Sequence, residues 1–447
     1  MSALLDLLTD VLDRARAKGA SEADAFVVED QSFSAQVRMG HVDTVKHARD
    51  QHLALRVFVG RSAAAASTSD LSRDSLDRLV DEAVTLARIT APDPLSGLAD
   101  HGELARGVPD LDLDDPRGHD LAPAAKIELA RRCEQAALGY DPRITNSEGG
   151  DFGDGHARYA YATSHGFAGE YRSSSFSLST SPLASHNGEM QRDGWYHTTR
   201  KRASLDAPEA IGRVAAQRAL RRLGARRVKT AEVPVIFDPQ MAATLIRHIA
   251  GAASGPSLYR GASFLLNRLG ETIAAPSITI VDDGTLPGAL GSRPFDGEGL
   301  PTRRTVLVDR GVLTSYLLDS YSARKLGLAS THHAARDGSG VTVSTTNLHL
   351  APGDASPESL IRSVKSGLYV TELIGFGVNG VTGDYSRGAV GMWIDNGELA
   401  YPVEEITVAG NLLEMFRAVE GVGNDLVFRD RTAAPTLLIG RMVVAGD

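Results

Sequence analysis

The C-terminal half of the chain is a succession of strand-like runs separated by Gly-rich turns, which limits the folds open to it. Apolar runs such as "SITIVDDG", "LYVTELIGFG" and "AVGMWIDNGELAYPVEEITVAG" follow one another from residue 231 onward. Dipeptides typical of tight turns separate them: Asp283-Gly284, Asp337-Gly338 and Asn396-Gly397. Strands joined by tight turns pair antiparallel, so we predict a mostly antiparallel β domain with a few helices. Those helices are expected at 239–253, 256–268 and 356–366.

The first 230 residues show a different pattern, in which helices alternate with runs of strands. Helical spacing of apolar residues predicts four helices: 2–18, 71–90, 123–138 and 206–223. Between them lie strand runs, one of which turns back on itself at Gly60. Helix, strand run, helix, strand run is an α+β pattern and hints at an internal duplication, although no repeat is visible residue by residue.

The length of the chain indicates two domains, because 447 residues are too many for one compact core. We place an N-terminal α+β domain at 1–230 and a C-terminal β-rich domain at 231–447. The last helix before this boundary is the best marked. Asp206 and Glu209 form a capping-box pattern at its start, and Gly224 ends it.

Composition indicates an ordinary globular chain of a reducing compartment. The net charge of −9 implies no bulk attraction to nucleic acid or membranes. Cys133 is the single cysteine, so no intramolecular disulfide can form. The N-terminal helix is interrupted by Asp6, Asp10 and Asp13, unlike a secretory signal, and no run reaches the roughly 20 apolar residues of a membrane span. We expect a cytoplasmic protein.

Several catalytic motifs are excluded, either because the neighbouring residues do not fit or because the motif is absent. "GFGVNG" at 375–380 fits G-x-G-x-x-G, but a dinucleotide site needs a helix directly after it, and "VTGDYSRGAVG" follows instead. The sequence contains no G-x-x-x-x-G-K-[ST] and no G-x-S-x-G, which excludes P-loop chemistry and a nucleophile elbow.

Three histidines are candidate metal ligands. His248 stands alone in "LIRHIAGAAS", whereas a zinc peptidase helix carries two histidines and a glutamate. His332 and His333, followed by Asp337, could form a second cluster. Adjacent residues of an extended segment point in opposite directions, so we interpret this stretch as a polar loop.

A basic segment, residues 191–230, holds eleven Lys and Arg against three Asp and Glu. The first interpretation is a solvated helix face packed beside an acidic neighbour. A subunit contact and a nucleic-acid surface are the alternatives, although no aromatic residues are interleaved as in known nucleic-acid motifs.

Long stretches of the chain resemble one known family. "SLYRGASFLLNRLGETI", "GALGSRPFDGEGLPTRR" and the run 366–413 are similar to the TldD/PmbA family of bacterial peptidase proteins, and specifically to its PmbA branch, also called TldE. "RVFVGRSAAAASTSDLSRDSLDRLVDEAVTLAR" and "PDPLSGLAD" extend the resemblance over the first domain. It implies two α+β domains, a paired assembly and a role in cytoplasmic proteolysis. The older family label, modulator of DNA gyrase, does not by itself imply DNA binding.

The metal motif of the TldD branch is missing here. In that branch a helix at the start of the second domain carries H-E-x-x-x-H, and a later cysteine completes a zinc site. The matching helix of this chain reads "MAATLIRHIAGAAS", and "DLVFRDRTAAPTLLIG" near the C-terminus has no cysteine. No catalytic or metal residue is therefore carried over, and zinc is expected in the partner subunit only.

The resemblance implies a non-catalytic subunit that pairs with a TldD-type catalytic subunit and contacts small or unfolded peptides. A second copy of the chain could also pair with it in isolation. Glycines allow close backbone approach to a peptide, so we expect the Gly-rich run to line the cleft with six residues: Phe376, Asn379, Asp384, Tyr385, Ser386 and Arg387. Asn411 is expected to fix a turn. Two alternatives stay open: a metal site formed by His248 with His332 or Asp384, and a nucleic-acid or regulatory binding protein.

Overall fold

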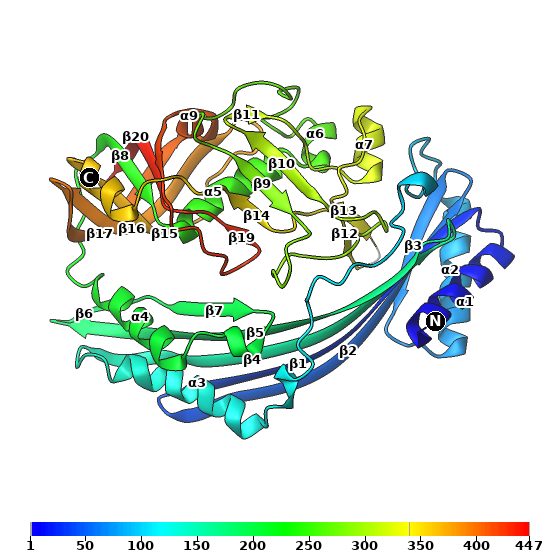
Figure 1. Cartoon of the computed structure of the whole chain (residues 1–447), viewed down its shortest axis with the longest axis horizontal. Coiled ribbons are helices and arrows are strands. Elements are labelled where there is room, and N and C mark those ends of the chain that lie inside the picture. The colour runs from blue at the N-terminus through cyan, green and yellow to red at the C-terminus, as the bar shows by residue number, and fades with distance from the viewer. Residues whose placement is uncertain (1, 339, 447) are drawn as a thin grey trace.

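The computed structural model describes residues 2–338 and 340–446. Its first half is one antiparallel sheet in the order β3-β2-β1-β4-β5-β6, with β7 also paired to β5. The strands are β1 (Glu22–Arg38), β2 (His41–Val59), β3 (Ser62–Thr68), β4 (Ile144–Thr163), β5 (Ala168–His186), β6 (Glu189–Arg192) and β7 (Trp195–Thr199). Figure 1 shows that this long sheet is curved and that the C-terminal half of the chain sits over its concave side.

Four helices cover the convex side of the sheet (Figure 1). They are α1 (Ala3–Ala17), α2 (Arg73–Ile89), α3 (Pro123–Leu138) and α4 (Pro208–Leu220). Short 3-10 turns lie at His101–Glu103, Gly118–Asp120 and Arg202–Ser204. The order α1-β1-β2-β3-α2 is followed by α3-β4-β5-β6-β7-α4, and β1 pairs with β4 where the halves meet. This repeated order agrees with the duplication that the sequence hinted at.

Two glycines bring the helices close to the sheet and to each other. A Cβ at Gly150 would lie 2.2 Å from the Ala130 carbonyl oxygen of α3, and a Cβ at Gly212 would lie 2.4 Å from the Cys133 carbonyl oxygen. Any larger residue would force these backbones apart. Cys133 lies fully buried in this layer, and burial raises the pKa of its thiol to about 12.

The second half contains two larger sheets and a small hairpin around one core. One sheet follows the order β17-β16-β15-β8-β20-β18, and an additional pairing of β17 with β20 closes five of these strands into a ring. These strands are β8 (Ala231–Phe237), β15 (Ser366–Ile374), β16 (Asp384–Asp395), β17 (Glu398–Asn411), β18 (Val419–Val422) and β20 (Leu437–Ala445). The other sheet joins β9 (Ile280–Asp283), β10 (Arg304–Asp309), β11 (Val312–Leu313), β14 (Leu348–Leu350) and β19 (Thr432–Ala433). The hairpin pairs β12 (Ala334–Asp337) with β13 (Gly340–Val343).

Helices fill the space around these sheets. They are α5 (Pro239–Ala252), α6 (Gly255–Tyr259), α7 (Ser320–Leu326), α8 (Pro357–Ser363) and α9 (Leu412–Arg417). Helix α5 contributes the fully buried Leu245, Ile246 and Ile249 to the core. The α+β class predicted from the sequence is thereby confirmed. No helix among residues 2–338 and 340–446 is long and apolar enough to cross a bilayer.

Two local predictions were wrong. The helix expected at 256–268 ends at Tyr259, because Gly261 and Asn267 adopt left-handed backbone angles (φ 67° and 61°) that an α-helix cannot contain. The capping box at Asp206 does not form either. Ala207 is the N-cap of α4, and the Asp206 carboxylate lies 3.4 Å from Nδ1 of His197 instead.

The two halves are joined by buried charges as well as by apolar contacts. The Asp24 carboxylate of β1 accepts from Arg56 of β2 and lies 2.7 Å from Nη2 of Arg336 of β12, and all three side chains are largely or fully buried. Tyr161 and Phe167 from the N-terminal sheet pack with Phe295 from the second half. These contacts fix the C-terminal half on the concave side of the sheet.

Glu298 lies in the same interface and gives a prediction for pH. Its carboxylate accepts from the Ser320 amide at 2.9 Å, and burial together with the nearby Asp296 raises its pKa from 4.5 to about 7. The folded protein therefore binds this proton more tightly than the unfolded chain. The stabilisation is full below pH 4.5 and is lost as the pH rises through 7.

We expect the free energy of unfolding of Glu298→Gln to rise relative to that of the parent chain as the pH increases from 5 to 8. Urea unfolding at several pH values measures this difference. The matched control is Glu82→Gln, since Glu82 is exposed on α2. If the difference in unfolding free energy between Glu298→Gln and the parent chain stays constant across this pH range, the pKa of Glu298 is not raised.

Candidate functional site

Helix α5 positions His248 at the edge of a hollow. The helix begins at Pro239, and the Asp238 side chain caps it by accepting from the Met241 amide at 2.8 Å. Its apolar residues face the core, which leaves His248 on the opposite, partly exposed side. Nε2 of His248 is buried and has no hydrogen-bond partner among the described residues.

The Gly-rich run forms the connection between β15 and β16, and its backbone is held from both ends. The Ser386 amide donates to the Gly377 carbonyl at 2.7 Å, and the Asn379 amide donates to the Asp384 carbonyl at 2.8 Å. A Cβ at Gly377 would lie 1.9 Å from the Ser386 carbonyl oxygen, so only glycine fits there. Phe376, at the tip of this connection, is fully exposed.

Three polar side chains meet where this connection faces α5. The rings of His248 and Tyr385 are 6.2 Å apart, edge to face, and Arg387 donates to the Leu373 carbonyl at 3.2 Å. The Tyr385 hydroxyl and Nε of Arg387 are buried without hydrogen-bond partners among the described residues. Burial, followed by the charges of Arg387 and Arg247, lowers the pKa of His248, so the imidazole is neutral at pH 7. Burial also raises the pKa of Tyr385, which keeps the phenol protonated.

These residues border two hollows. One, of about 360 Å³, lies between α5 and the connection and is lined by His248, Arg387 and Phe376, among others. The other, of about 530 Å³ and more open, is lined by Phe376–Gly380 and Asp384–Ser386. All six residues predicted for the cleft therefore border a hollow.

The individual roles of these residues differ from one another. Asp384 accepts from the Thr382 hydroxyl and from the Asn411 amide group, which lower the pKa of its carboxyl. The side-chain oxygen of Asn379 accepts from the Val381 amide at 2.9 Å. Asp384 and Asn379 thus shape the connection, whereas Arg387 and Phe376 present a cation and an apolar ring to the hollows. Tyr385 is buried beneath them against His248. Asn411 also caps α9.

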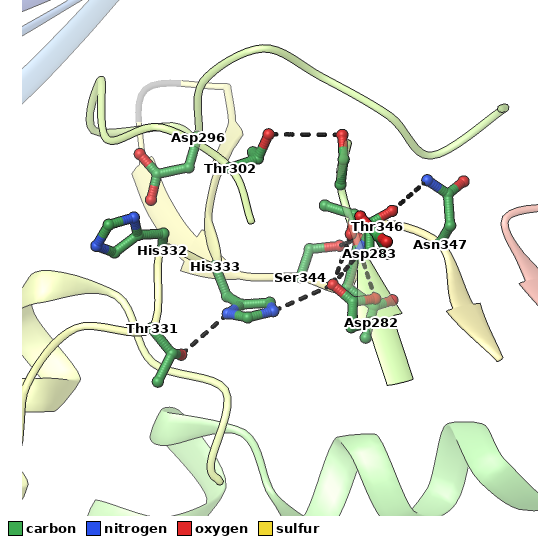
Figure 2. A network of polar contacts seen from close by, with 12 residues as sticks. Asp282, Asp283, Asp296, Thr302, Thr331, His332, His333, Ser344, Thr346 and Asn347 are labelled. Atoms are coloured by element: carbon green, nitrogen blue, oxygen red, sulfur yellow. Dashed lines mark hydrogen bonds and ion pairs between the residues drawn. The ribbon is translucent and has the colours of Figure 1, made fainter. Parts of the chain in front are cut away.

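His332 and His333 lie elsewhere and face different partners, as Figure 2 shows. The His333 ring is buried between Thr331 and Asp282, with Nε2 3.1 Å from the Asp282 carboxylate. Nδ1 of His332 lies 2.7 Å from the Pro301 carbonyl oxygen. Residues 331–333 lie in a loop, as expected, and the His333 ring is buried there with Asp282 and Thr331 as its polar partners. The side chain of Asp337 lies outside the described residues.

Many cations of the basic segment 191–230 pair with acidic residues, both inside the segment and elsewhere in the chain. At least six of its eleven cations form ion pairs: Arg192, Lys201, Arg218, Arg221, Arg222 and Arg227. Arg222, for example, pairs with Glu372 of β15 in the C-terminal half. The guanidinium of Arg226 lies 3.5 Å from the ring centre of Tyr401. This pattern agrees with a basic face packed beside acidic neighbours.

Comparison with known proteins places the chain in a family. Sequence models described as PmbA/TldA metallopeptidase domain 1, central domain and C-terminal domain match residues 23–87, 116–223 and 230–446. The chain is 42% identical to the metalloprotease PmbA of Escherichia coli O157:H7, over 96% of this chain and 94% of the relative. The chain belongs to the PmbA/TldD family.

Other family members agree in sequence and in fold. A PmbA homologue from Haemophilus influenzae is 37% identical over 96% of this chain and 93% of its own length. The crystal structure of a proposed modulator of DNA gyrase from Bacteroides thetaiotaomicron superposes with a TM-score of 0.92, at 31% identity and over 99% and 98% of the two chains. TldE from Thermococcus kodakarensis has the same fold, with a TM-score of 0.90 at 21% identity over 98% of this chain and 100% of that one.

The family description implies a metal, and the residues at α5 do not fit one. His248 is the one possible ligand on that helix, and its polar neighbours are a protonated phenol and a guanidinium. A guanidinium repels a cation and cannot ligate it. Within residues 2–338 and 340–446, no three His, Cys, Asp or Glu side chains form a group that could hold a metal ion.

The sequence predicted the Gly-rich connection as a cleft, and it related His248 to this connection only through a possible metal site with Asp384. Tyr385 and Arg387 are separated from His248 by more than 130 positions, and no local motif joins them. Their alternation along β16 was the available signal: Tyr385 is buried while Asp384 and Ser386 are exposed.

Proposed function

We propose that this chain is the non-catalytic, PmbA/TldE-type subunit of a two-component metallopeptidase. The observation that carries the proposal is the composition of α5, which offers one histidine and no glutamate where the TldD branch has its metal motif. In this proposal a TldD-type partner supplies zinc, and this chain supplies walls and peptide contacts. The complex would process small or unfolded peptides in the cytoplasm.

The hollows beside the Gly-rich connection suit a peptide. Phe376 offers an apolar contact, and the partly exposed, neutral His248 lines the hollow beside α5. Arg387 adds a cation next to them. None of these groups is a nucleophile or a base activated by a neighbour, so the surface is suited to binding and orienting a chain rather than to cleaving it.

The test is peptidase activity of the pure chain, and then of the chain mixed with a TldD-type partner. We expect no chelator-sensitive activity from the chain alone and activity from the mixture above that of the partner alone. Chelator-sensitive cleavage by the pure chain would overturn the proposal. So would stoichiometric zinc that survives dialysis and is lost in His248→Ala.

A further inference from the structure

A separate cavity lies between the two halves of the molecule, away from the Gly-rich connection. It measures about 570 Å³, within the range of sites for small molecules. The concave face of the N-terminal sheet forms one wall, with Phe26, Tyr159 and Tyr171. The loop 290–297 and the hairpin β12–β13 of the C-terminal half form the other. The family resemblance and the proposed function assign nothing to this place.

Stacked aromatic rings line the first wall. Tyr159 and Tyr171 are directly opposite on β4 and β5, and their rings stack with centroids 4.9 Å apart and planes 18° apart. Phe26 continues the row beside Tyr159, and Phe295 meets Tyr171 edge to face at 5.4 Å. Burial raises the pKa of both tyrosines, so their hydroxyls remain neutral. Such a surface suits a planar, unsaturated group.

Arginines line the same cavity, and for Arg200 and Arg293 the described residues supply no ion pair. Nε and Nη2 of Arg293 are buried and have no hydrogen-bond partner among the described residues. Arg200 donates to the Ser174 and Leu290 carbonyls at 3.0 and 2.5 Å, while its Nε has no partner among the described residues. Burial lowers the pKa of Arg200, and the groups that oppose this shift are Tyr159 and Tyr171, not carboxylates. Arg336 differs, since Asp24 pairs with it.

Among the described residues that line the cavity, Asp296 carries the one carboxylate, and backbone amides hold it. Asp296 accepts from the Glu298, Leu300 and Ala334 amides at 2.8, 3.0 and 3.2 Å. Burial raises the pKa of this carboxyl. Arg200, Arg293 and the exposed Arg431 therefore leave the cavity with an excess of positive charge. A buried guanidinium without a partner is costly, and an anion supplied by a ligand would satisfy it.

We propose that this cavity binds a small aromatic anion, with its ring on the Tyr159–Tyr171 stack and its carboxylate or phosphate held by Arg293 and Arg200. The carboxylate and the phosphate correspond to two different kinds of ligand. A carboxylate would come from an aromatic residue at the end of a peptide, and a phosphate from a mononucleotide. The shared chemistry is a planar ring with a negative group beside it.

Isothermal titration of the full chain with four compounds tests the proposal. N-acetyl-L-phenylalanine and adenosine monophosphate carry the anion, and N-acetyl-L-phenylalaninamide and adenosine are their neutral counterparts. We expect at least one anion to bind with a Kd below about 1 mM and its neutral counterpart to bind at least about tenfold more weakly. The pair that shows this difference identifies the anionic group.

Variants show whether the binding occurs in this cavity. Arg293→Gln is expected to weaken binding of the anion at least about tenfold, and Tyr171→Leu to weaken it by loss of the ring contact. Arg310→Gln is the control, because Arg310 lies on the surface in the turn between β10 and β11. Circular dichroism shows whether each variant is folded. If Arg293→Gln does not fold, the binding measured for Tyr171→Leu decides the test. Failure of both anions to bind, equal binding of the neutral compounds, or unchanged binding by the folded variants would overturn the proposal.

Discussion

Asp24→Asn is expected to lower the free energy of unfolding by about 3–5 kcal/mol. The Asp24 carboxylate is fully buried and serves both Arg56 and Arg336. The Tyr161 hydroxyl donates to the same carboxylate at 3.1 Å. Asparagine keeps the shape and removes the charge, so two buried guanidinium groups would face each other without their shared counter-charge. Urea unfolding at pH 7, followed by circular dichroism, measures the loss.

The control for this prediction is an exposed ion pair of the same kind. Asp77 pairs with Arg14 at 2.7 Å on the surface of α1 and α2, and Asp77→Asn is expected to cost less than about 1 kcal/mol.

The contribution of Asp24 to the free energy of unfolding also depends on pH in a defined direction. Arg336 and Arg56 together lower the pKa of Asp24 despite its burial, so its contribution is present at neutral pH and is lost as the pH falls through the folded pKa. Equal losses in the two variants would show that the buried cluster is not a main contact between the halves.

The regular part of this fold could be predicted from local patterns. Apolar residues at helical spacing gave α1, α2, α3 and α4 to within a few residues. The Asn396-Gly397 turn between β16 and β17 has φ angles of 49° and 83°, the left-handed geometry that this dipeptide favours. These features depend on residues that are neighbours along the chain, so they can be predicted from one sequence.

The contacts between the two halves could not be predicted, because they join residues far apart along the chain. Asp24 and Arg336 are separated by more than 300 positions, and each by itself has the sequence context of an ordinary surface charge. Arg293 has no motif around it that predicts a buried, unpaired cation. The long strands β1, β4 and β5 curve around the C-terminal half (Figure 1), and only that curvature brings these residues together.

The candidate cleft could be predicted in part. Its glycines were visible as a run, and the close approach of Gly377 to Ser386 explains one of them. The partners of His248 were not visible, since they depend on how α5 lies against β16. The proposed site is therefore a predicted loop whose chemistry is completed by a helix from another part of the sequence.

The largest functional effect is expected from Gly377→Ala in a complex of this chain with a TldD-type partner, and this expectation rests on the proposed function. The new Cβ would lie 1.9 Å from the Ser386 carbonyl oxygen, so the connection must move away from β16. Phe376 precedes Gly377 directly and would move with it. Displacement of about 1 Å in a substrate-positioning surface costs about 100-fold in rate, and kcat/KM for peptide cleavage should fall by that factor.

Gly380→Ala is a matched control within the same connection. A Cβ at Gly380 would find its nearest neighbour at 3.8 Å, an ordinary contact with the Ala262 carbonyl oxygen, and we expect kcat/KM to stay within about twofold of the parent complex. Both variants add one methyl group to the same loop, so a difference between them reports the position of the connection and not its composition. Gel filtration shows whether each variant still assembles with the partner. If assembled Gly377→Ala cleaves peptides as fast as assembled Gly380→Ala, the Gly-rich connection does not position the substrate, and the chain acts on cleavage through some other surface.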